Sequence, residues 1–186
     1  MAGRKRGRLA VIIAGLLGLA ALPAPAQAGY TDFGYEIGPV AIPDGHGSAR
    51  LSFDLTAPPT ASITAVRPNF RINHRRTRQL KLLVKGPDGT TVLLSDHETH
   101  GRKLGRDPCA PDPNQLAFTG FWDSGVNGPI SAGSPPYTGY FVPHDPLSAY
   151  AGANYGGNWQ VIVKDTVPGK RGRLLCGAMS IYYTAS

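Results

Sequence analysis

The chain has 186 residues, and its 19 Lys and Arg against 12 Asp and Glu give it a formal net charge of +7 at pH 7. Its 24 glycines and 17 prolines interrupt every stretch that could repeat apolar residues at helical spacing. This composition excludes folds built on long helices and favours a single all-β domain.

The first 28 residues have the three parts of a secretory signal peptide. Residues 9–22 are apolar, and Ala26-Gln27-Ala28 fits the small-residue cleavage site. A basic region precedes them, formed by Arg4, Lys5, Arg6 and Arg8. The apolar run is shorter than the roughly 20 residues that a membrane-spanning helix needs. We therefore expect cleavage after Ala28, secretion of the mature chain, no transmembrane segment after cleavage, and a mature net charge of about +3.

Beyond the signal peptide, residues 29–38 are predicted to be an N-terminal extension and residues 39–186 one domain. Gly, Pro, Asn and Asp bound each apolar run, as the turns between strands require. The predicted strands are Ala49–Leu55, Ile63–Asn73, Gln79–Val84, Thr90–Ser95, Leu116–Trp122, Tyr137–Val142, Asn158–Lys164 and Arg173–Tyr183. The turn at Pro87-Asp88-Gly89 predicts a hairpin over 79–95. About eight mainly antiparallel strands with one long connection predict a jelly-roll-type β-sandwich.

The chain has two cysteines, Cys109 and Cys176. In an exported protein an even pair of cysteines indicates one disulfide, so the pairing is fixed. Closing a loop of this length stabilises the fold by about 4 kcal/mol in the chain-entropy model. The cysteines lack the spacing of a redox or zinc motif, so we expect a structural role.

Three clusters of basic residues fall in predicted turns. The first holds Arg75, Arg76 and Arg78, the second holds Arg102, Lys103 and Arg106, and the third is Lys170-Arg171-Gly172-Arg173. Because neighbouring strands alternate in direction, the first and second clusters are predicted to lie at the same end of the sandwich. They are either solvated turn residues or a positive patch for an acidic partner, such as a wall polymer or an acidic protein face. No nucleic-acid-binding motif accompanies them, so no nucleic-acid partner is predicted.

The sequence lacks the usual signatures of catalysis. It has no G-x-S-x-G, no H-E-x-x-H and no glycine-rich loop between a strand and a helix. The segment Gly45-His46-Gly47-Ser48 is similar to the surroundings of a subtilase histidine, but the other parts of such a site are missing, and we expect a turn. The remaining histidines fall in loops and are expected to be surface residues: His74, His97, His100 and His144. No catalytic residue is predicted, and the chain is not expected to be an enzyme.

Calcium is the metal that the sequence allows, since loop carboxylates often hold it in secreted β-sandwiches. The candidate ligands are Asp44, Asp123 and Asp165, although no D-x-D-x-D run connects them. No other cofactor is predicted. Trp122 and Trp159 lie within predicted strands, where aromatic side chains usually fill a sandwich core, so they are expected to pack inside rather than to stack on sugars.

An ordered series of phrases runs through the predicted domain. In chain order they are Ala41-Ile42-Pro43-Asp44, Gly86-Pro87-Asp88-Gly89-Thr90-Thr91-Val92-Leu93-Leu94, Tyr137-Thr138-Gly139-Tyr140 with Pro143, Leu147-Ser148-Ala149-Tyr150, Gly156-Gly157-Asn158-Trp159-Gln160-Val161, and Lys164-Asp165 with Gly172 and Leu174. The series resembles the P domain, or Homo B domain, of kexin- and furin-like subtilases. This chain departs from the family at Gln79, where an aspartate is usual, and near Gly177, where the family's second tryptophan is missing.

The resemblance implies a jelly-roll β-sandwich that packs against a subtilisin-like catalytic domain, stabilises it and tunes its response to calcium and pH. We therefore expect an exported, non-catalytic accessory module without a catalytic domain on this chain, which acts on a serine protease or another cell-surface partner. The alternative is a free-standing sandwich that binds cell-wall glycans or anionic polymers.

Overall fold

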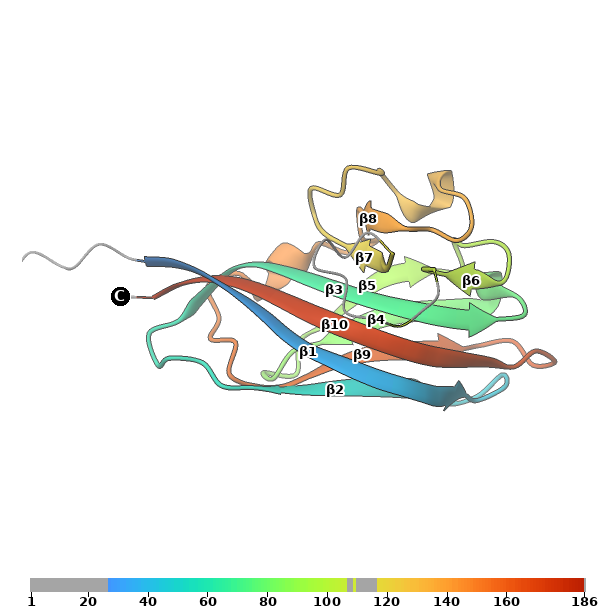
Figure 1. Cartoon of the computed structure of the whole chain (residues 1–186), viewed down its shortest axis with the longest axis horizontal. Helices are drawn as coiled ribbons and strands as arrows, with labels where there is room; N and C mark the ends of the chain where they lie inside the picture. The colour runs from blue at the N-terminus through green and yellow to red at the C-terminus, as the bar shows by residue number, and fades with distance from the viewer. Residues whose placement is uncertain (1–26, 107–108, 110–116, 186) are drawn as a thin grey trace, which may run out of the picture.

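The computed structural model describes residues 27–106, 109 and 117–185, which form two packed β-sheets (Figure 1). Residues 1–26 of the predicted signal peptide lie outside the described residues. The six-stranded sheet has the order β1-β10-β3-β7-β8, with β6 also paired to β3: β1 (Gln27–Ile42), β10 (Gly172–Ala185), β3 (Ser62–His74), β7 (Thr119–Phe121), β8 (Gly139–Phe141) and β6 (Lys103–Leu104). The four-stranded sheet has the order β2-β9-β4-β5: β2 (Ala49–Leu55), β9 (Gly157–Asp165), β4 (Leu80–Lys85) and β5 (Thr91–Asp96).

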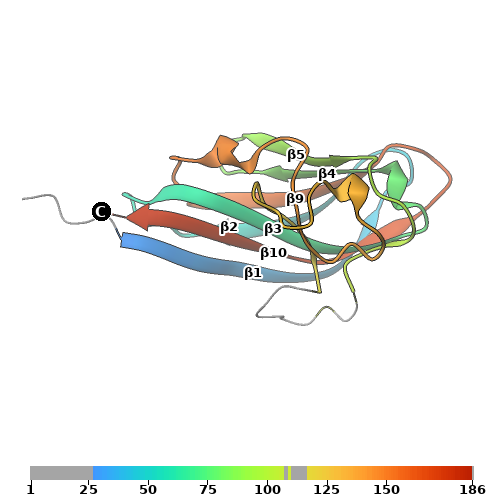
Figure 2. The ribbon, with the colours of Figure 1, turned by 90° about the horizontal axis from the view of Figure 1, so that it is seen from above.

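The connections contain three 3-10 helices, η1 (Thr77–Gln79), η2 (Ile130–Ala132) and η3 (Leu147–Tyr150). No helix in the described part of the chain is long and apolar enough to cross a membrane. Paired strands are antiparallel except β7 and β8, and the chain passes repeatedly from one sheet to the other (Figure 2). This order is that of a jelly roll, so the predicted all-β sandwich is confirmed.

Alternation of inward and outward residues explains why the predicted strands form. In β2 every second residue is buried, including Leu51 and Phe53, and the bounds agree with the prediction. The hairpin of β4 and β5 is confirmed as well. Its turn is closed by hydrogen bonds of 2.9 Å from Gly86 N to Thr90 O and from Thr90 N to Asp88 Oδ1. Gly89 has φ 91°, a conformation that glycine takes without strain.

The sequence analysis predicted neither β1 nor β6. β1 pairs with β10 along most of its length, but its register shifts between Phe33 and Glu36 and between Ile37 and Val40. These irregularities fall at the glycines of positions 34 and 38 and at Pro39. Glycine and proline interrupt the alternating pattern from which strands are predicted, because they mark bulges and edge positions in sheets. β6 has only two residues, too few for any pattern.

The end of the sandwich at the β4–β5 turn is closed by aromatic side chains. Trp159 is fully buried, as predicted, and its ring centroid lies 4.9 Å from that of Tyr150. The Tyr150 hydroxyl donates to Val84 O at 2.9 Å, and Trp159 Nε1 donates to Tyr155 O at 2.8 Å. Burial raises the pKa of the Tyr150 hydroxyl above its ordinary value. We call Tyr150, Tyr155, Trp159 and the turn at 86–90 the aromatic end.

The prediction that Trp122 packs in the core is wrong. Strand β7 ends at Phe121, whose side chain is fully buried, so the next residue points to the opposite face. Trp122 is half-buried there, and the guanidinium of Arg67 lies 3.6 Å from its ring centroid. Rings of Tyr140 and Tyr182 flank the same guanidinium. A cation–π contact thus replaces core packing.

The predicted disulfide between Cys109 and Cys176 is confirmed, with 6.1 Å between the Cα atoms. Cys176 is fully buried on β10, opposite Arg71 of β3. The bond therefore ties the connection between β6 and β7 to an inner strand of the six-stranded sheet.

Candidate functional site at the basic end

Pairing of β10 and β6 with β3 brings distant turns together at the end of the sandwich opposite the aromatic end. Gly172 of β10 lies opposite His74 of β3, and Lys103 of β6 lies opposite Asn73. His74 N also donates to Arg102 O at 2.9 Å. The turns that follow β3, precede β6 and precede β10 therefore meet.

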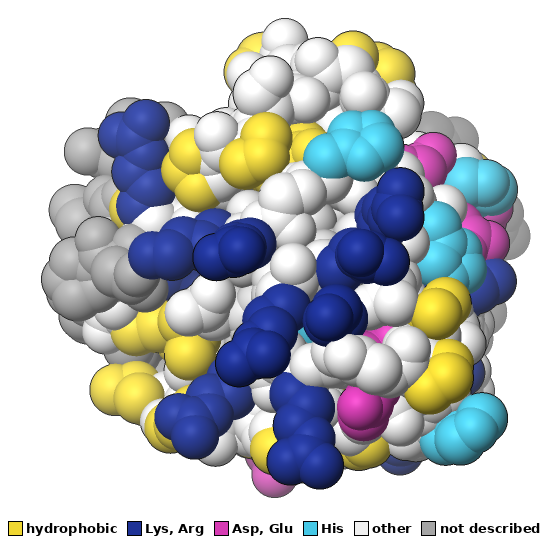
Figure 3. Space-filling model, turned by 90° about the vertical axis from the view of Figure 1, so that its right-hand side faces the viewer, with side chains coloured by type: hydrophobic (Ala, Val, Ile, Leu, Met, Phe, Trp, Pro, Cys, Tyr) yellow, Lys and Arg dark blue, Asp and Glu magenta, His cyan; other side chains and the backbone are white. Residues whose placement is uncertain are grey.

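These three turns carry the three basic clusters. We call the set of nine cations the basic end: Arg75, Arg76, Arg78, Arg102, Lys103, Arg106, Lys170, Arg171 and Arg173. Eight of the nine are exposed, Lys170 being half-buried. Figure 3 shows Lys and Arg side chains crossing this end of the molecule. The first and second clusters lie together as predicted, and the third cluster joins them, which the sequence analysis did not predict.

Three grooves run over the basic end. The Arg171 groove, of about 420 Å³, is lined by Asn73, His74, Arg75, Arg102, Arg171, Gly172 and Arg173. The Arg106 groove, of about 540 Å³, is lined by Arg102, Lys103, Gly105, Arg106, Pro135 and Pro136. The Arg78 groove, of about 340 Å³, is lined by Arg75, Arg76, Arg78, His100, Gly101 and Arg102. Arg102 lines all three.

Three arginines of these grooves lack a carboxylate partner within the part of the chain that the structure describes. Among the described residues, no carboxylate forms an ion pair with Arg75, Arg102 or Arg171. Elsewhere such pairs do form: Lys81 Nζ lies 2.9 Å from Asp96 Oδ2, and this hydrogen bond lowers the pKa of the carboxyl below its usual range. The basic end is therefore a concentrated positive field that faces solvent.

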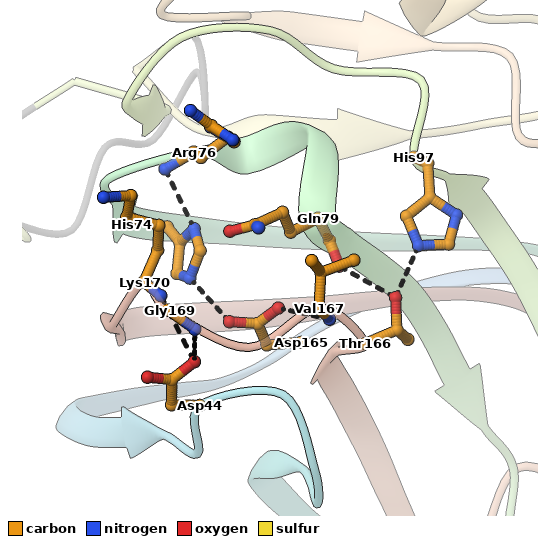
Figure 4. A network of polar contacts seen from close by, with 10 residues as sticks. All are labelled: Asp44, His74, Arg76, Gln79, His97, Asp165, Thr166, Val167, Gly169 and Lys170. Carbon is orange, nitrogen blue, oxygen red and sulfur yellow. Dashed lines mark hydrogen bonds and ion pairs between the residues drawn. The ribbon is translucent and has the colours of Figure 1, made fainter.

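A buried polar network lies beneath the basic end (Figure 4). His74 Nε2 lies 3.1 Å from Asp165 Oδ2, and both side chains are fully buried. His74 Nδ1 accepts from Arg76 N at 3.1 Å. Because a backbone N–H can only donate, the ring proton is on Nε2 and is donated to Asp165. The prediction of a surface histidine is wrong for His74, which holds the backbone of the first cluster.

The same network fixes the third cluster. Asp44 Oδ1 accepts from Gly169 N at 2.6 Å and from Lys170 N at 3.2 Å. Asp165 Oδ1 accepts from Val167 N at 3.1 Å. Two aspartates and one histidine thus set the backbone from which two basic clusters project. Sequence carries no signal for the His74–Asp165 pair, whose members are 91 residues apart.

The calcium candidates do not converge on one site. Asp44 and Asp165 accept loop N–H groups as described above, and Asp123 accepts from Leu147 N and Ser148 N, both at 2.7 Å. Within the described residues, no group of three or more His, Cys, Asp or Glu is arranged to hold a metal. Asp44 and Asp165 hold the loop between β9 and β10, whereas Asp123 holds the start of η3.

One arrangement has the atom order of a catalytic triad, and the sequence analysis did not predict it. His97 Nδ1 contacts Asp96 Oδ1, and His97 Nε2 lies 2.6 Å from Thr166 Oγ1. The Thr166 hydroxyl also lies 3.3 Å from Gln79 O, which can only accept. Figure 4 lets the reader follow both contacts of this hydroxyl. A hydroxyl has one proton, so Thr166 donates either to His97 Nε2 or to Gln79 O, and the tautomer of His97 decides which.

The segment Gly45-His46-Gly47-Ser48 forms the predicted turn. Gly45 has φ 70° and Gly47 has φ 97°, and His46 is exposed. Ser48 Oγ accepts from Arg50 Nε at 3.2 Å. His46 and Ser48 thus belong to a loop beside β2, and no hydrogen bond joins these two described residues.

No family model and no curated protein matches this chain. Among solved structures, the chain is similar to that of the serine protease of Aeromonas sobria with its chaperone, at 14% identity, a TM-score of 0.46, and coverage of 85% of this chain and 28% of that chain. It is also similar to the serine protease of Aeromonas sobria, at 13% identity, a TM-score of 0.44, and coverage of 83% and 27%. The chain spans little more than a quarter of those chains.

Proposed function

We propose that this protein is a secreted, non-catalytic binding module that recognises a negatively charged partner through its basic end. The observation that carries the proposal is the meeting of three arginine-rich turns at one end, where Arg75, Arg102 and Arg171 have no carboxylate partner among the described residues. Clustered charge of one sign destabilises a folded protein through self-repulsion, so such a surface is better explained by a ligand than by stability.

Secretion is supported by the leader-like N-terminal sequence and by the disulfide, a bond that persists in oxidising compartments. A non-catalytic role is supported by the sequence, which lacks the usual signatures of catalysis. It is also supported by His74, whose two ring nitrogens are occupied by Asp165 and by the backbone N–H of Arg76.

Two partner classes follow from the sequence. The phrases that resemble the P domain favour a subtilisin-like serine protease, which the module would stabilise or regulate as an accessory. The second class is an anionic polymer of the cell wall. The geometry of the basic end favours the polymer, because the site consists of arginine-lined grooves rather than an apolar face.

The test is affinity capture from culture supernatant with three baits. One is the native protein, one carries Arg75→Glu, Arg102→Glu and Arg171→Glu, and the matched control carries Arg50→Glu, Lys85→Glu and Lys164→Glu. The control cations are exposed on the outer face of the four-stranded sheet, and both variants change the net charge equally. We expect the native and control baits to retain a partner that the basic-end variant loses. Equal recovery by all three baits would reject the proposal.

A further inference from the structure

The three grooves of the basic end adjoin at a shared residue, and we call them together the depression. Arg102 lines all of them, and Arg75 lines both the Arg171 groove and the Arg78 groove. Each groove has a volume within the range of small-ligand sites, and together they exceed what one small anion fills. A ligand that occupies the whole depression must be long enough to pass from one groove into the next.

The lining of the depression is suited to oxyanions. In the described part of the chain, no acidic side chain and no Phe, Tyr or Trp lines any of the three grooves. Arginine dominates, and its planar guanidinium donates paired hydrogen bonds to phosphate or carboxylate oxygens.

The arrangement of cations around Arg102 favours phosphate over carboxylate. Arg102 shares one groove with Arg171, another with Arg106 and a third with Arg78. An anion beside Arg102 therefore meets donors from more than one direction. The two non-bridging oxygens of a phosphodiester accept hydrogen bonds over a wide cone of directions, whereas the oxygens of a carboxylate accept them mainly in the plane of the group.

We propose that the basic end binds a linear polymer of phosphodiester-linked units, with Arg75, Arg102 and Arg171 as its main contacts. This inference rests on the proposed function and names its ligand class. A flexible chain gains affinity from successive weak contacts because each bound phosphate raises the effective concentration of the next.

A folded acidic protein fits the surface less well. The large exposed hydrophobic residues of the described chain are Ile37, Val126 and Val167. None of them lines the three grooves. Stable protein interfaces have an apolar core, and the basic end presents only the rings of Pro135 and Pro136 for that purpose.

The test is calorimetric titration of the purified protein with poly(glycerol phosphate) of increasing length, beginning with glycerol phosphate itself. We expect affinity to rise with length and to level off once the chain fills the depression. We also expect affinity to fall with salt, each contact with a flexible chain contributing about 0.7 to the log–log slope.

The variants described above locate the binding. The variant with Arg75→Glu, Arg102→Glu and Arg171→Glu should lose about tenfold or more in affinity, and its salt slope should fall by about 2 because three contacts are lost. The control with Arg50→Glu, Lys85→Glu and Lys164→Glu should keep most of its affinity. Circular dichroism of each variant verifies folding, and the length and salt series of the native protein tests the proposal without any variant.

Three comparison ligands separate the outcomes. If serum albumin, a folded acidic protein, binds through the basic end and the polymer does not, the polymer inference is overturned and the proposed function stands. If polygalacturonate binds equally well, or oligothymidylate of equal phosphate number does not bind, the phosphodiester inference is likewise overturned. If no anion binds, or both variants lose affinity equally, the basic end is not the site and both proposals fail.

Discussion

The two ends of this sandwich are closed by different kinds of buried side chain. At the aromatic end, Tyr150 and Trp159 close the core, and the polar atoms of both side chains donate to backbone carbonyls. At the basic end the buried groups are polar, His74 and Asp165, and the outer surface carries nine cations. One end gains stability from burial, whereas the other uses its internal hydrogen bonds to hold charged turns in place.

The residues that stabilise the fold are therefore largely separate from the residues that are exposed for binding. Apolar burial contributes most of the free energy of folding, while surface charges contribute little. Changes at the aromatic end should therefore affect stability and leave ligand binding intact. Changes on the outer surface of the basic end should do the opposite, with the buried network between them affecting both.

The largest effect on stability is expected from Trp159→Ala. The substitution removes a fully buried ring and its hydrogen bond to Tyr155 O, and it leaves a cavity beside Tyr150. We expect a loss of about 3–5 kcal/mol in the free energy of unfolding, measured by urea denaturation. A loss below about 1 kcal/mol would mean that the burial of Trp159 contributes little to the stability of the fold.

Asp165→Asn should have the next largest effect. The amide keeps the shape of the carboxylate but has one acceptor oxygen instead of two, so either His74 Nε2 or Val167 N loses its acceptor. We expect a loss of about 1.5–3 kcal/mol in unfolding free energy. Because the network positions two basic clusters, polymer affinity should fall as well, although every cation is retained. Unchanged affinity would show that the cations do not depend on this pair.

Tyr150→Phe should cost about 1–2 kcal/mol, since it leaves Val84 O without the hydroxyl donor. It should also change the response to alkali. Burial raises the pKa of Tyr150 in the folded protein, so this contribution to stability is complete below the ordinary tyrosine pKa of about 10 and is lost as the pH rises beyond it. Above that pH, the unfolding free energy of the native protein should fall more steeply than that of Tyr150→Phe. Parallel curves would contradict the burial effect.

The smallest effect on stability is expected from the triple variant with Arg75→Glu, Arg102→Glu and Arg171→Glu. All three side chains are exposed, so each change should stay within about 0.5 kcal/mol. Its thermal midpoint should match that of the native protein or exceed it slightly, because like charges are removed. A large drop would mean that these arginines are structural, and the contrast between the two ends would disappear.

Regular alternation made much of this fold predictable. β2 and the β4–β5 hairpin follow from apolar spacing and turn residues, and their places were predicted closely. β1 could not be predicted, since its glycines and Pro39 hide the pattern. Trp122 was misplaced because β7 ends one residue before it, and such a boundary decides which face a side chain takes.

Part of the candidate site could also be predicted from the regular alternation of the strands. Strand alternation placed the first and second basic clusters at one end, which is where they lie. The third cluster joins through the register of β10 against β3, and His74 meets Asp165 only because β3 and β9 end at the same level. Contacts of this kind depend on tertiary packing and leave no local mark in the sequence.

Strand β1 ends the six-stranded sheet, so one side of it has no neighbouring strand in the described chain. A long, regular edge offers unpaired backbone groups to which a second molecule can add its own strand, the usual start of aggregation. Here two register shifts and Pro39, which lacks an N–H, interrupt that row. The residues that concealed β1 from prediction thus also protect the sheet from continuing into another molecule.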